Sequence, residues 1–274
     1  MGNKIVEWLA ALTTSAEEAG PDILVLQFTV VNAFLVGRPG GAFALVDTGL
    51  ENSAEFIVKQ ARQRFGNGGR PEAIILTHGH FDHVGSVVAL CSQWGIPAYI
   101  HPLELPYVTG KKDYPLADPT VDDGLVAKLS PTFPHTAIDL GAHARPLPPD
   151  GSVPGMPGWR WVHTPGHTEG HVALFREQDR TLIAGDAFAT VKQESLWSVV
   201  TQQEQISGPP KYLTVDWEAA ERSVGLLRNL QPAVALPSHG QPMKGQELDR
   251  HLDLLVSHFG AIAVPEQGRF VEGP

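Results

Sequence analysis

Short apolar runs separated by turn residues dominate the N-terminal part of the chain. The runs Ile23–Val30 and Asn32–Val36 predict two consecutive strands, because they are short, apolar and bounded by turn residues. The turn Arg38–Gly41 then leads into a third predicted strand, Phe43–Val46. The pattern indicates hairpin-like β structure in this part of the protein.

Helical and strand-like patterns alternate after this region. Asn52 or Ser53 offers a side chain that can cap a helix reaching toward Phe65. The continuous apolar run Ala73–Leu76 predicts a strand that is buried on both faces. The elements expected next are a helix over Val84–Trp94 and a strand over Ala98–Ile100.

Residues 110–158 break this regularity. They are rich in proline, glycine and aspartate and show little periodicity, which is typical of a lid or a binding loop. Apolar periodicity returns after this loop, and residues 188–260 supply a C-terminal strand and helices. The elements expected in the second part are strands at Trp159–Val162, His171–Phe175, Thr181–Ala184 and Ala233–Leu236, and helices at Val215–Asn229 and Gln246–Phe259.

The order of these elements favours an α/β protein with two sheets. The strands fall into two groups, each mixed with helices, and the sequence shows no internal repeat. No glycine-rich phosphate loop follows a strand, which argues against a doubly wound nucleotide-binding fold. We therefore expect residues 1–274 to form one domain, with helices outside the two sheets.

Composition and charge limit the kinds of binding partner that the protein can have. The chain of 274 residues is 42% hydrophobic and carries a formal net charge of −10. Nucleic acids and anionic membranes are not expected as partners, because both need clustered Lys and Arg. The sequence has neither a long apolar run nor a leader-like N-terminal stretch, so we expect a cytoplasmic protein. The single cysteine, Cys91, is expected to be a packed thiol.

The run Thr77–His83 carries the most informative chemistry. It directly follows a predicted buried strand, so a rigid element holds it in place. His78 and His80 are separated by one residue and can offer two imidazoles to one ion, whereas Asp82 and His83 can serve a neighbouring ion. Imidazole and carboxylate groups together suit zinc, and also iron or manganese.

These donors cannot complete two open metal sites, so further ligands are expected downstream. His167, Asp186 and His239 each lie on a short loop after a predicted strand. Strands that end at a common edge would gather these side chains with the histidine-rich run. The sequence therefore predicts a dinuclear metal site.

The order His-x-His-x-Asp-His, Gly-His, Gly-Asp and Ser-His-Gly resembles the metallo-β-lactamase-fold hydrolases of the glyoxalase II type. The resemblance extends from Asp47 to His239. It implies a four-layer αββα sandwich of two mixed β-sheets flanked by helices, and it implies that Asp47 orients a ligand histidine. The ligand sets that it implies are His78, His80 and His167 for one metal ion, and Asp82, His83 and His239 for the other, with Asp186 as the bridge.

Two divalent transition-metal ions are the cofactors that the resemblance implies, with zinc favoured and iron or manganese as alternatives. Two adjacent cations lower the pKa of a bridging water from ~15.7 toward ~7, which gives a hydroxide that can attack a small ester, thioester or lactone. Asp82 is expected to accept or orient the proton of this nucleophile. Phe81, Phe188, Trp197 and Tyr212 are candidates for the walls of the cleft, with Phe188 and Tyr212 as candidate substrate contacts.

Differences between this sequence and known subfamilies limit the range of possible substrates. An aspartate bridge argues against a penicillin-hydrolysing enzyme, and the net charge of −10 argues against a tRNA-processing nuclease. Ala189 stands where homoserine-lactone hydrolases have a tyrosine, and the stretch after His239 is too short for the glutathione-binding region of glyoxalase II. A small-molecule substrate is expected, and a homo-oligomer is left open. The alternatives are an N-acyl homoserine lactonase, a mononuclear-iron persulfide dioxygenase of the same fold, and a non-catalytic metal-binding protein.

Overall fold

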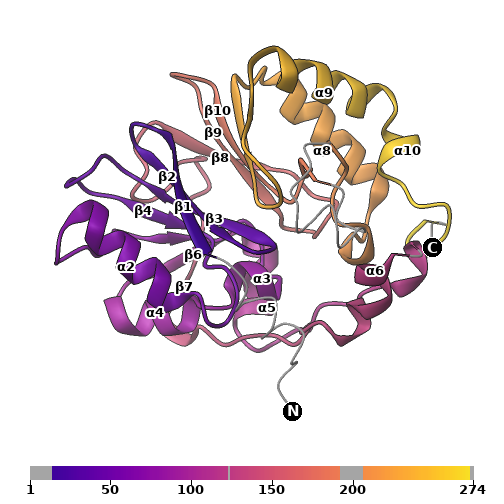
Figure 1. Ribbon diagram of the computed structural model, residues 1–274. Coiled ribbons are helices and arrows are strands. Elements are labelled where there is room, and N and C mark those ends of the chain that lie inside the picture. Colours follow the sequence, from indigo (N-terminus) through magenta and orange to yellow (C-terminus); the bar gives the residue numbers. More distant parts are fainter. Residues whose placement is uncertain (1–13, 123, 192–205, 272–274) are drawn as a thin grey trace. The chain divides into compact units, whose positions relative to one another are not determined.

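The computed structural model describes residues 14–122, 124–191 and 206–271 (Figure 1). The contacts divide the chain into two compact units. The first unit comprises residues 1–114 and 134–159, and the second comprises residues 115–133 and 160–274. Each unit contains its own β-sheet and its own hydrophobic core. The single domain expected from the sequence stays a prediction.

The first unit contains a seven-stranded mixed sheet in the order β1-β2-β3-β4-β5-β6-β7. Strands β1 to β4 pair antiparallel, and β4 to β7 pair parallel. The strand bounds are β1 Thr14–Gly20, β2 Ile23–Phe28, β3 Val31–Val36, β4 Ala44–Val46, β5 Ile74–Ile75, β6 Ala98–Ile100 and β7 Ala144–Pro146.

Helices α2 (Ala54–Phe65) and α4 (Val87–Trp94) bury their apolar faces in the core of this unit. Helix α2 contributes residues such as Ile57 and Ala61, which are spaced for one helical face. Between α2 and α4 the chain forms β5 and the short helix α3 (Phe81–Val84). Sheet and helices therefore hold both ends of the histidine-rich run.

The continuous helix expected over residues 84–94 is wrong, because α3 and α4 are separate helices. Gly85 lies between them, and its N–H donates to Gly49 O at 3.0 Å. Ser86 also lies there, and its hydroxyl donates to Leu50 O at 2.7 Å. These bonds tie the junction between α3 and α4 to the loop that follows β4.

Two strands of the first sheet had no signal in the apolar pattern. Strand β1 is polar and mostly exposed, and it pairs with β2 from Thr14↔Phe28 onward. Strand β7 has only three residues, two of them exposed, and it pairs parallel with β6. Both lie at the edges of the sheet, where one face need not be buried and the alternation of apolar residues is lost.

Residues 110–158 are less irregular than their composition predicts. They contain β7, the short helix α6 (Leu125–Leu129) and the single-turn 3-10 helices η2 (Pro119–Val121), η3 (Ser130–Thr132) and η4 (Gly141–His143). Asp118 caps η2, since its Oδ1 accepts the Thr120 N–H at 2.9 Å. The role of this region as a lid stays a prediction.

The second unit contains a five-stranded mixed sheet in the order β12-β11-β10-β9-β8. Strand β10 pairs parallel with β11 and antiparallel with β9, and β11 pairs antiparallel with β12. The strand bounds are β8 Trp159–His163, β9 Val172–Arg176, β10 Thr181–Gly185, β11 Val234–Pro237 and β12 Met243–Lys244.

Helices α8 (Trp217–Asn229) and α9 (Gly245–Ser257) pack their apolar faces into the core of the second unit. Asp216 caps α8, because its carboxylate accepts the Ala219 N–H at 2.8 Å. Arg228 of α8 donates to Asp253 of α9 at 2.6 Å, which joins the outer surfaces of the two helices. The short helix α10 (Phe259–Ile262) follows α9.

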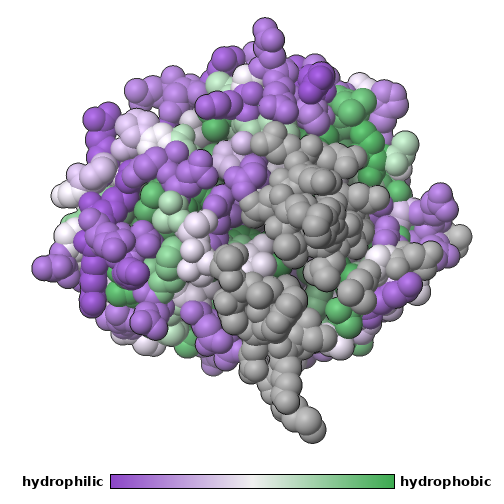
Figure 2. Space-filling model, in the orientation of Figure 1, coloured by the Kyte–Doolittle hydropathy of each residue, from purple (hydrophilic) through white to green (hydrophobic). Residues whose placement is uncertain are grey.

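Hydrophilic residues cover most of the coloured surface on the face that Figure 2 shows. Among the described residues, no helix combines the length and the apolar character needed to cross a membrane.

Candidate metal centre

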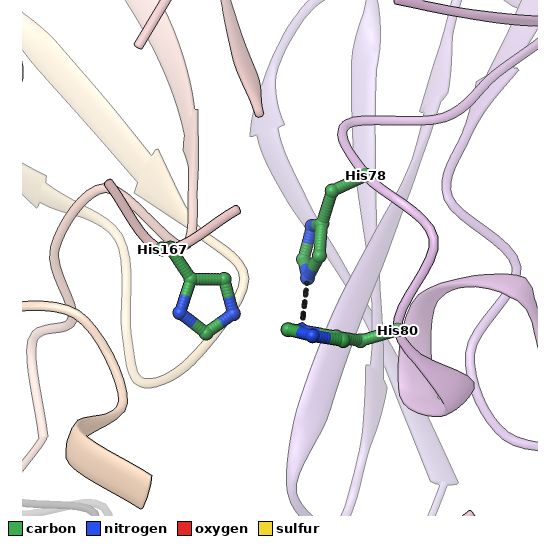
Figure 3. A group of neighbouring side chains, drawn as sticks. All are labelled: His78, His80 and His167. Atoms are coloured by element: carbon green, nitrogen blue, oxygen red, sulfur yellow. Dashed lines mark hydrogen bonds between the residues drawn. The ribbon is translucent and has the colours of Figure 1, made fainter. Parts of the chain in front are cut away.

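The loop after β5 carries the first pair of candidate ligands (Figure 3). His78 is fully buried and His80 is 5% exposed, so both imidazoles are withdrawn from bulk water. The Nε2 of His78 lies 3.0 Å from the Nδ1 of His80. Two nitrogens that share one tetrahedral zinc at about 2.05 Å lie roughly 3.3 Å apart, so this spacing suits a shared ion.

A chain of hydrogen bonds fixes the protonation of His78. The Thr77 hydroxyl donates to Asp47 Oδ2 at 2.8 Å, so its oxygen is free to accept from His78 Nδ1, which lies 3.1 Å away. With its proton on Nδ1, His78 directs the Nε2 lone pair toward His80. His80 Nδ1 therefore donates to His78 Nε2, and a bound metal ion would replace that proton.

Asp47 anchors a second candidate ligand, His83. Its Oδ2 lies 2.9 Å from His83 Nδ1, and its Oδ1 accepts the Thr77 N–H at 2.8 Å. Asp47 therefore contacts a histidine of the run, and the orienting role that the resemblance implies for it stays a prediction. The contact places the proton of His83 on Nδ1 and leaves Nε2 as a lone-pair donor.

The residue that holds His83, Asp47, has an unusual backbone conformation. Asp47 has a φ of +56°, a left-handed conformation that is uncommon for residues other than glycine and that aspartate tolerates better than most. The side chain is completely buried. His83 Nε2 also faces Asp82 Oδ1 at 3.8 Å, so an imidazole and a carboxylate point toward a common position.

The second unit has its own set of donors, centred on Asp186 at the end of β10. Asp186 Oδ2 lies 3.3 Å from His167 Nε2 and 3.2 Å from His239 Nε2. His167 lies on the loop after β8 (Figure 3), and His239 follows β11. One carboxylate oxygen thus lies beside two imidazole nitrogens, and the role of Asp186 as a bridge stays a prediction.

Thr214 sets the protonation of His167 in the same way as Thr77 sets that of His78. The Thr214 hydroxyl donates to Pro210 O at 2.8 Å, and its oxygen lies 3.1 Å from His167 Nδ1. The Nδ1 proton is therefore donated to Thr214, and the Nε2 lone pair is directed toward Asp186.

His171 positions the backbone of Asp186 instead of offering a donor atom. Its Nε2 accepts the Asp186 N–H at 2.8 Å, so its proton lies on Nδ1. Nδ1 lies 3.1 Å from Thr164 O and 2.8 Å from the Thr164 hydroxyl. Both ring nitrogens face protein groups, so His171 supports the backbone of Asp186.

The donors fit the cofactor that the sequence predicts. The described residues contain clusters of buried His and Asp side chains of the kind that hold metal ions. Imidazole nitrogens mixed with carboxylate oxygens suit zinc, iron or manganese better than magnesium or calcium, which prefer oxygen ligands alone.

The aromatic residues expected to form the walls of the cleft lie in different environments. Phe188 is fully buried in the hydrophobic core of the second unit, and the substrate contact expected for it stays a prediction. Tyr212 lies on the 3-10 helix η5 (Lys211–Leu213), is half-buried and packs edge-on against Phe133. Phe81 packs against the core of the first unit. Trp197 lies outside the described residues, and the role of Tyr212 stays a prediction.

Glu104 and Tyr114 were missed by sequence reasoning. Both are buried beside the histidine-rich run, and the Tyr114 hydroxyl donates to the Glu104 carboxylate. Burial and the adjacent negative charge of Glu104 raise the pKa of Tyr114 well above its usual value. They belong to the segment between the two groups of ligands, where no motif or periodicity marks them.

Cys91 is a packed thiol, as its place in a helix predicts. It is completely buried in the core of the first unit. Burial raises its pKa to about 12, so the thiol stays protonated at neutral pH and is a poor nucleophile.

Comparison with known proteins agrees with this chemistry. A family model described as the metallo-beta-lactamase superfamily matches residues 26–239. The chain is 46% identical over 247 residues to the protein named "Probable metallo-hydrolase YflN" of Bacillus subtilis (strain 168), covering 89% of this chain and 94% of the relative. It is 29% identical over 204 residues to "Probable metallo-hydrolase YybB" of the same organism, covering 74% and 78%.

Solved structures give the same fold. A di-iron-bound form of TTHA1623 aligns with a TM-score of 0.54 and 26% identity, covering 89% of this chain and 96% of that one. The BLEG-1 B3 metallo-beta-lactamase aligns with a TM-score of 0.57 over 87% and 98% of the two chains, but at 24% identity it supports the fold alone.

The two mixed sheets with their helices and the buried His and Asp clusters define a metal-binding α/β metallo-hydrolase. The chain belongs to the metallo-β-lactamase superfamily. The predicted superfamily and the predicted fold class, two mixed β-sheets flanked by helices, are thereby confirmed. The narrower resemblance to glyoxalase II stays a prediction.

Proposed function

We propose that the protein is a dinuclear metal-dependent hydrolase of small esters, thioesters or lactones, related in its chemistry to glyoxalase II. The observation that carries this proposal is the control of protonation. His78, His83 and His167 each have Nδ1 beside a hydroxyl or carboxylate oxygen of the protein, which leaves Nε2 as a lone-pair donor. A metal ligand requires this orientation, because the nitrogen that faces the ion must carry a lone pair.

The two donor sets divide between two ions in this proposal. The ligand sets are His78, His80 and His167 for one ion, and Asp82, His83 and His239 for the other, with Asp186 as the bridge. The support is the order of these residues along a chain of this superfamily, together with the orientation of the donors inside each unit. Zinc is the proposed metal, since nitrogen donors outnumber oxygen donors.

When bound, the two ions supply hydroxide at neutral pH and polarise the substrate carbonyl. The residues of the chain perform the remaining tasks. Asp82 would orient the nucleophile and accept its proton, because its carboxylate is mostly buried and its Oδ1 lies 3.8 Å from His83 Nε2, another proposed ligand. Asp47 fixes the orientation of the His83 ring through the contact between Oδ2 and Nδ1 at 2.9 Å.

The net charge of the chain and the residue at position 189 favour one class of substrate. A net charge of −10 disfavours polyanionic substrates such as tRNA. The position three residues after Asp186 is Ala189, which is 1% exposed and pairs its backbone with Ser207, so no phenol can bind a lactone from there. A small uncharged carbonyl substrate is therefore favoured, and thioesters and esters rank before homoserine lactones.

The test is a panel of carboxylic esters, thioesters, lactones and phosphodiesters, assayed on protein of measured metal content. We expect hydrolysis of at least one carbonyl substrate, loss of activity after chelation, and recovery with zinc. Asp82→Ala should lose activity while the protein stays folded, and Asp150→Ala, which changes an exposed aspartate of the first unit, should keep it. Hydrolysis of phosphodiesters alone would exclude the proposed substrate class, and unchanged rates in Asp82→Ala would remove the role of Asp82.

A further inference from the structure

The peptide between His78 and His80 has a support that the catalytic scheme does not use. Glu104 ends the 3-10 helix η1 (Pro102–Glu104) and is completely buried. Tyr114 follows the short helix α5 (Leu105–Val108) and is 7% exposed. A buried carboxylate is costly unless hydrogen bonds compensate for the loss of water, so its partners here are informative.

Both side chains bind the same backbone group. The Gly79 N–H lies 3.0 Å from the Tyr114 hydroxyl oxygen and 3.2 Å from Glu104 Oε2, and it donates to both. The Tyr114 hydroxyl in turn donates to Glu104. Carboxylate, phenol and amide form a closed triangle, and its amide belongs to the residue that separates the two histidines.

The ring of Tyr114 packs against two other aromatic rings. It lies 4.4 Å from the His80 ring and 4.0 Å from the Tyr107 ring, with which it is nearly parallel. Its backbone N–H donates to His135 O at 2.9 Å. The phenol therefore has little freedom to leave Gly79.

The Tyr114 hydroxyl lies so close to the backbone of Gly79 that only glycine fits between the two histidines. A Cβ on Gly79 would lie 2.5 Å from the Tyr114 hydroxyl oxygen, well inside contact distance. Here glycine is required by close approach and not by an unusual φ. The contact brings the polar pair against the backbone that sets the spacing of His78 Nε2 and His80 Nδ1.

We propose that Glu104 and Tyr114 are positioning residues for the first metal ion, acting through the Gly79 peptide to hold the two imidazoles at the spacing that a shared ion needs. This inference rests on the proposed function, because it assumes that His78 and His80 bind metal. Neither side chain is assigned a contact with substrate. A role in packing alone would require the rings and the volume but not the hydrogen-bonding groups.

Three conservative variants separate these roles. Tyr114→Phe keeps the ring stack and removes the hydroxyl, and Glu104→Gln keeps the volume and removes the charge. Tyr107→Phe is the matched control, because it removes a hydroxyl from the neighbouring ring of the same stack. Zinc affinity is measured by competition with a chelator, the site geometry by the visible spectrum of the Co²⁺-loaded protein, and the Gly79 amide by hydrogen exchange in metal-free protein.

We expect Tyr114→Phe and Glu104→Gln to weaken zinc binding about 10–100-fold, the range found when groups that orient metal ligands are removed. The Co²⁺ spectrum should change and Gly79 should exchange faster, whereas Tyr107→Phe should match the wild type in all three measurements. Equal zinc affinity and spectra in all variants would overturn the inference, and so would equal losses in Tyr107→Phe. If the wild type binds no zinc, the proposed function fails as well. If the wild type binds zinc and the Glu104 and Tyr114 variants bind it equally well, the positioning role alone is wrong.

Discussion

Replacement of Asp47 by asparagine should reverse the tautomer of His83. The carboxylate accepts from Thr77 N–H at 2.8 Å, from the Thr77 hydroxyl at 2.8 Å and lies 2.9 Å from His83 Nδ1. Asparagine matches its volume and tolerates the left-handed backbone at φ +56°. Its oxygen can still accept the Thr77 N–H, but the group beside His83 becomes an NH₂ donor. His83 must then move its proton to Nε2 or leave its place.

The magnitude follows from these contacts. The NH₂ group replaces the oxygen that faces both His83 Nδ1 and the Thr77 hydroxyl, and each hydrogen bond lost to this charged, fully buried group costs about 1.5–3 kcal/mol in the free energy of unfolding. The effect on metal binding should be about 10–100-fold, since the donor nitrogen of His83 becomes protonated. That range equals about 1.4–2.7 kcal/mol of binding free energy.

The assay combines zinc competition with nitrogen NMR of the histidine rings, which reports the tautomer of His83 without metal. We expect His83 to carry its proton on Nδ1 in the wild type and on Nε2 in Asp47→Asn. Asp150→Asn is the matched control, because it makes the same chemical change on an exposed turn of the same unit. An unchanged tautomer together with unchanged zinc affinity in Asp47→Asn would refute the reasoning.

Three further predictions concern other parts of the structure. His171→Gln removes the acceptor of the Asp186 N–H and should lower zinc affinity more than His163→Gln, whose ring lies at a half-buried position and contacts Glu169 O; equal affinities would contradict the positioning role. Burial acts to raise the pKa of Asp118, but hydrogen bonds from Arg269 and Thr120 hold that pKa below its usual value, so its contribution to stability is present at neutral pH and is lost as the pH falls through the lowered value. Denaturation with urea should show Asp118→Asn to be about 1–2 kcal/mol less stable at pH 7, with a difference that shrinks toward pH 3; a constant difference would contradict this. Cys91 should react with a thiol reagent only after unfolding, because burial raises its pKa to about 12; fast reaction of the native protein would contradict it.

Much of the fold could be predicted from the apolar pattern because its central strands are buried. Strands β2 and β3 are almost entirely buried, and so is β10, which makes each a clear apolar run. The polar strand β1 and the short strand β7 gave no such signal, because their pairing is made by backbone groups at the edges of the sheet. Backbone pairing of this kind leaves little trace in side-chain hydropathy.

The candidate site shows the same division. The histidines and aspartates were visible in the sequence because their residue types and spacing are uncommon outside metal sites. Glu104 and Tyr114 were not visible, because their link to Gly79 spans 25 and 35 positions in the chain. The sequence could not place Phe188 in the core of the second unit, because an aromatic residue next to a ligand loop has the same sequence signature in a core as in a cleft.

The central claim is that the chain holds two catalytic metal ions, and metal content measured against activity tests it most directly. Protein stripped by a chelator is titrated with zinc while bound metal and hydrolysis of a thioester or ester are followed in the same samples. The account predicts that activity rises with zinc and reaches its maximum at about two ions per chain. A single bound iron, with oxygen consumed in the presence of a persulfide and no hydrolysis at any zinc loading, would contradict it.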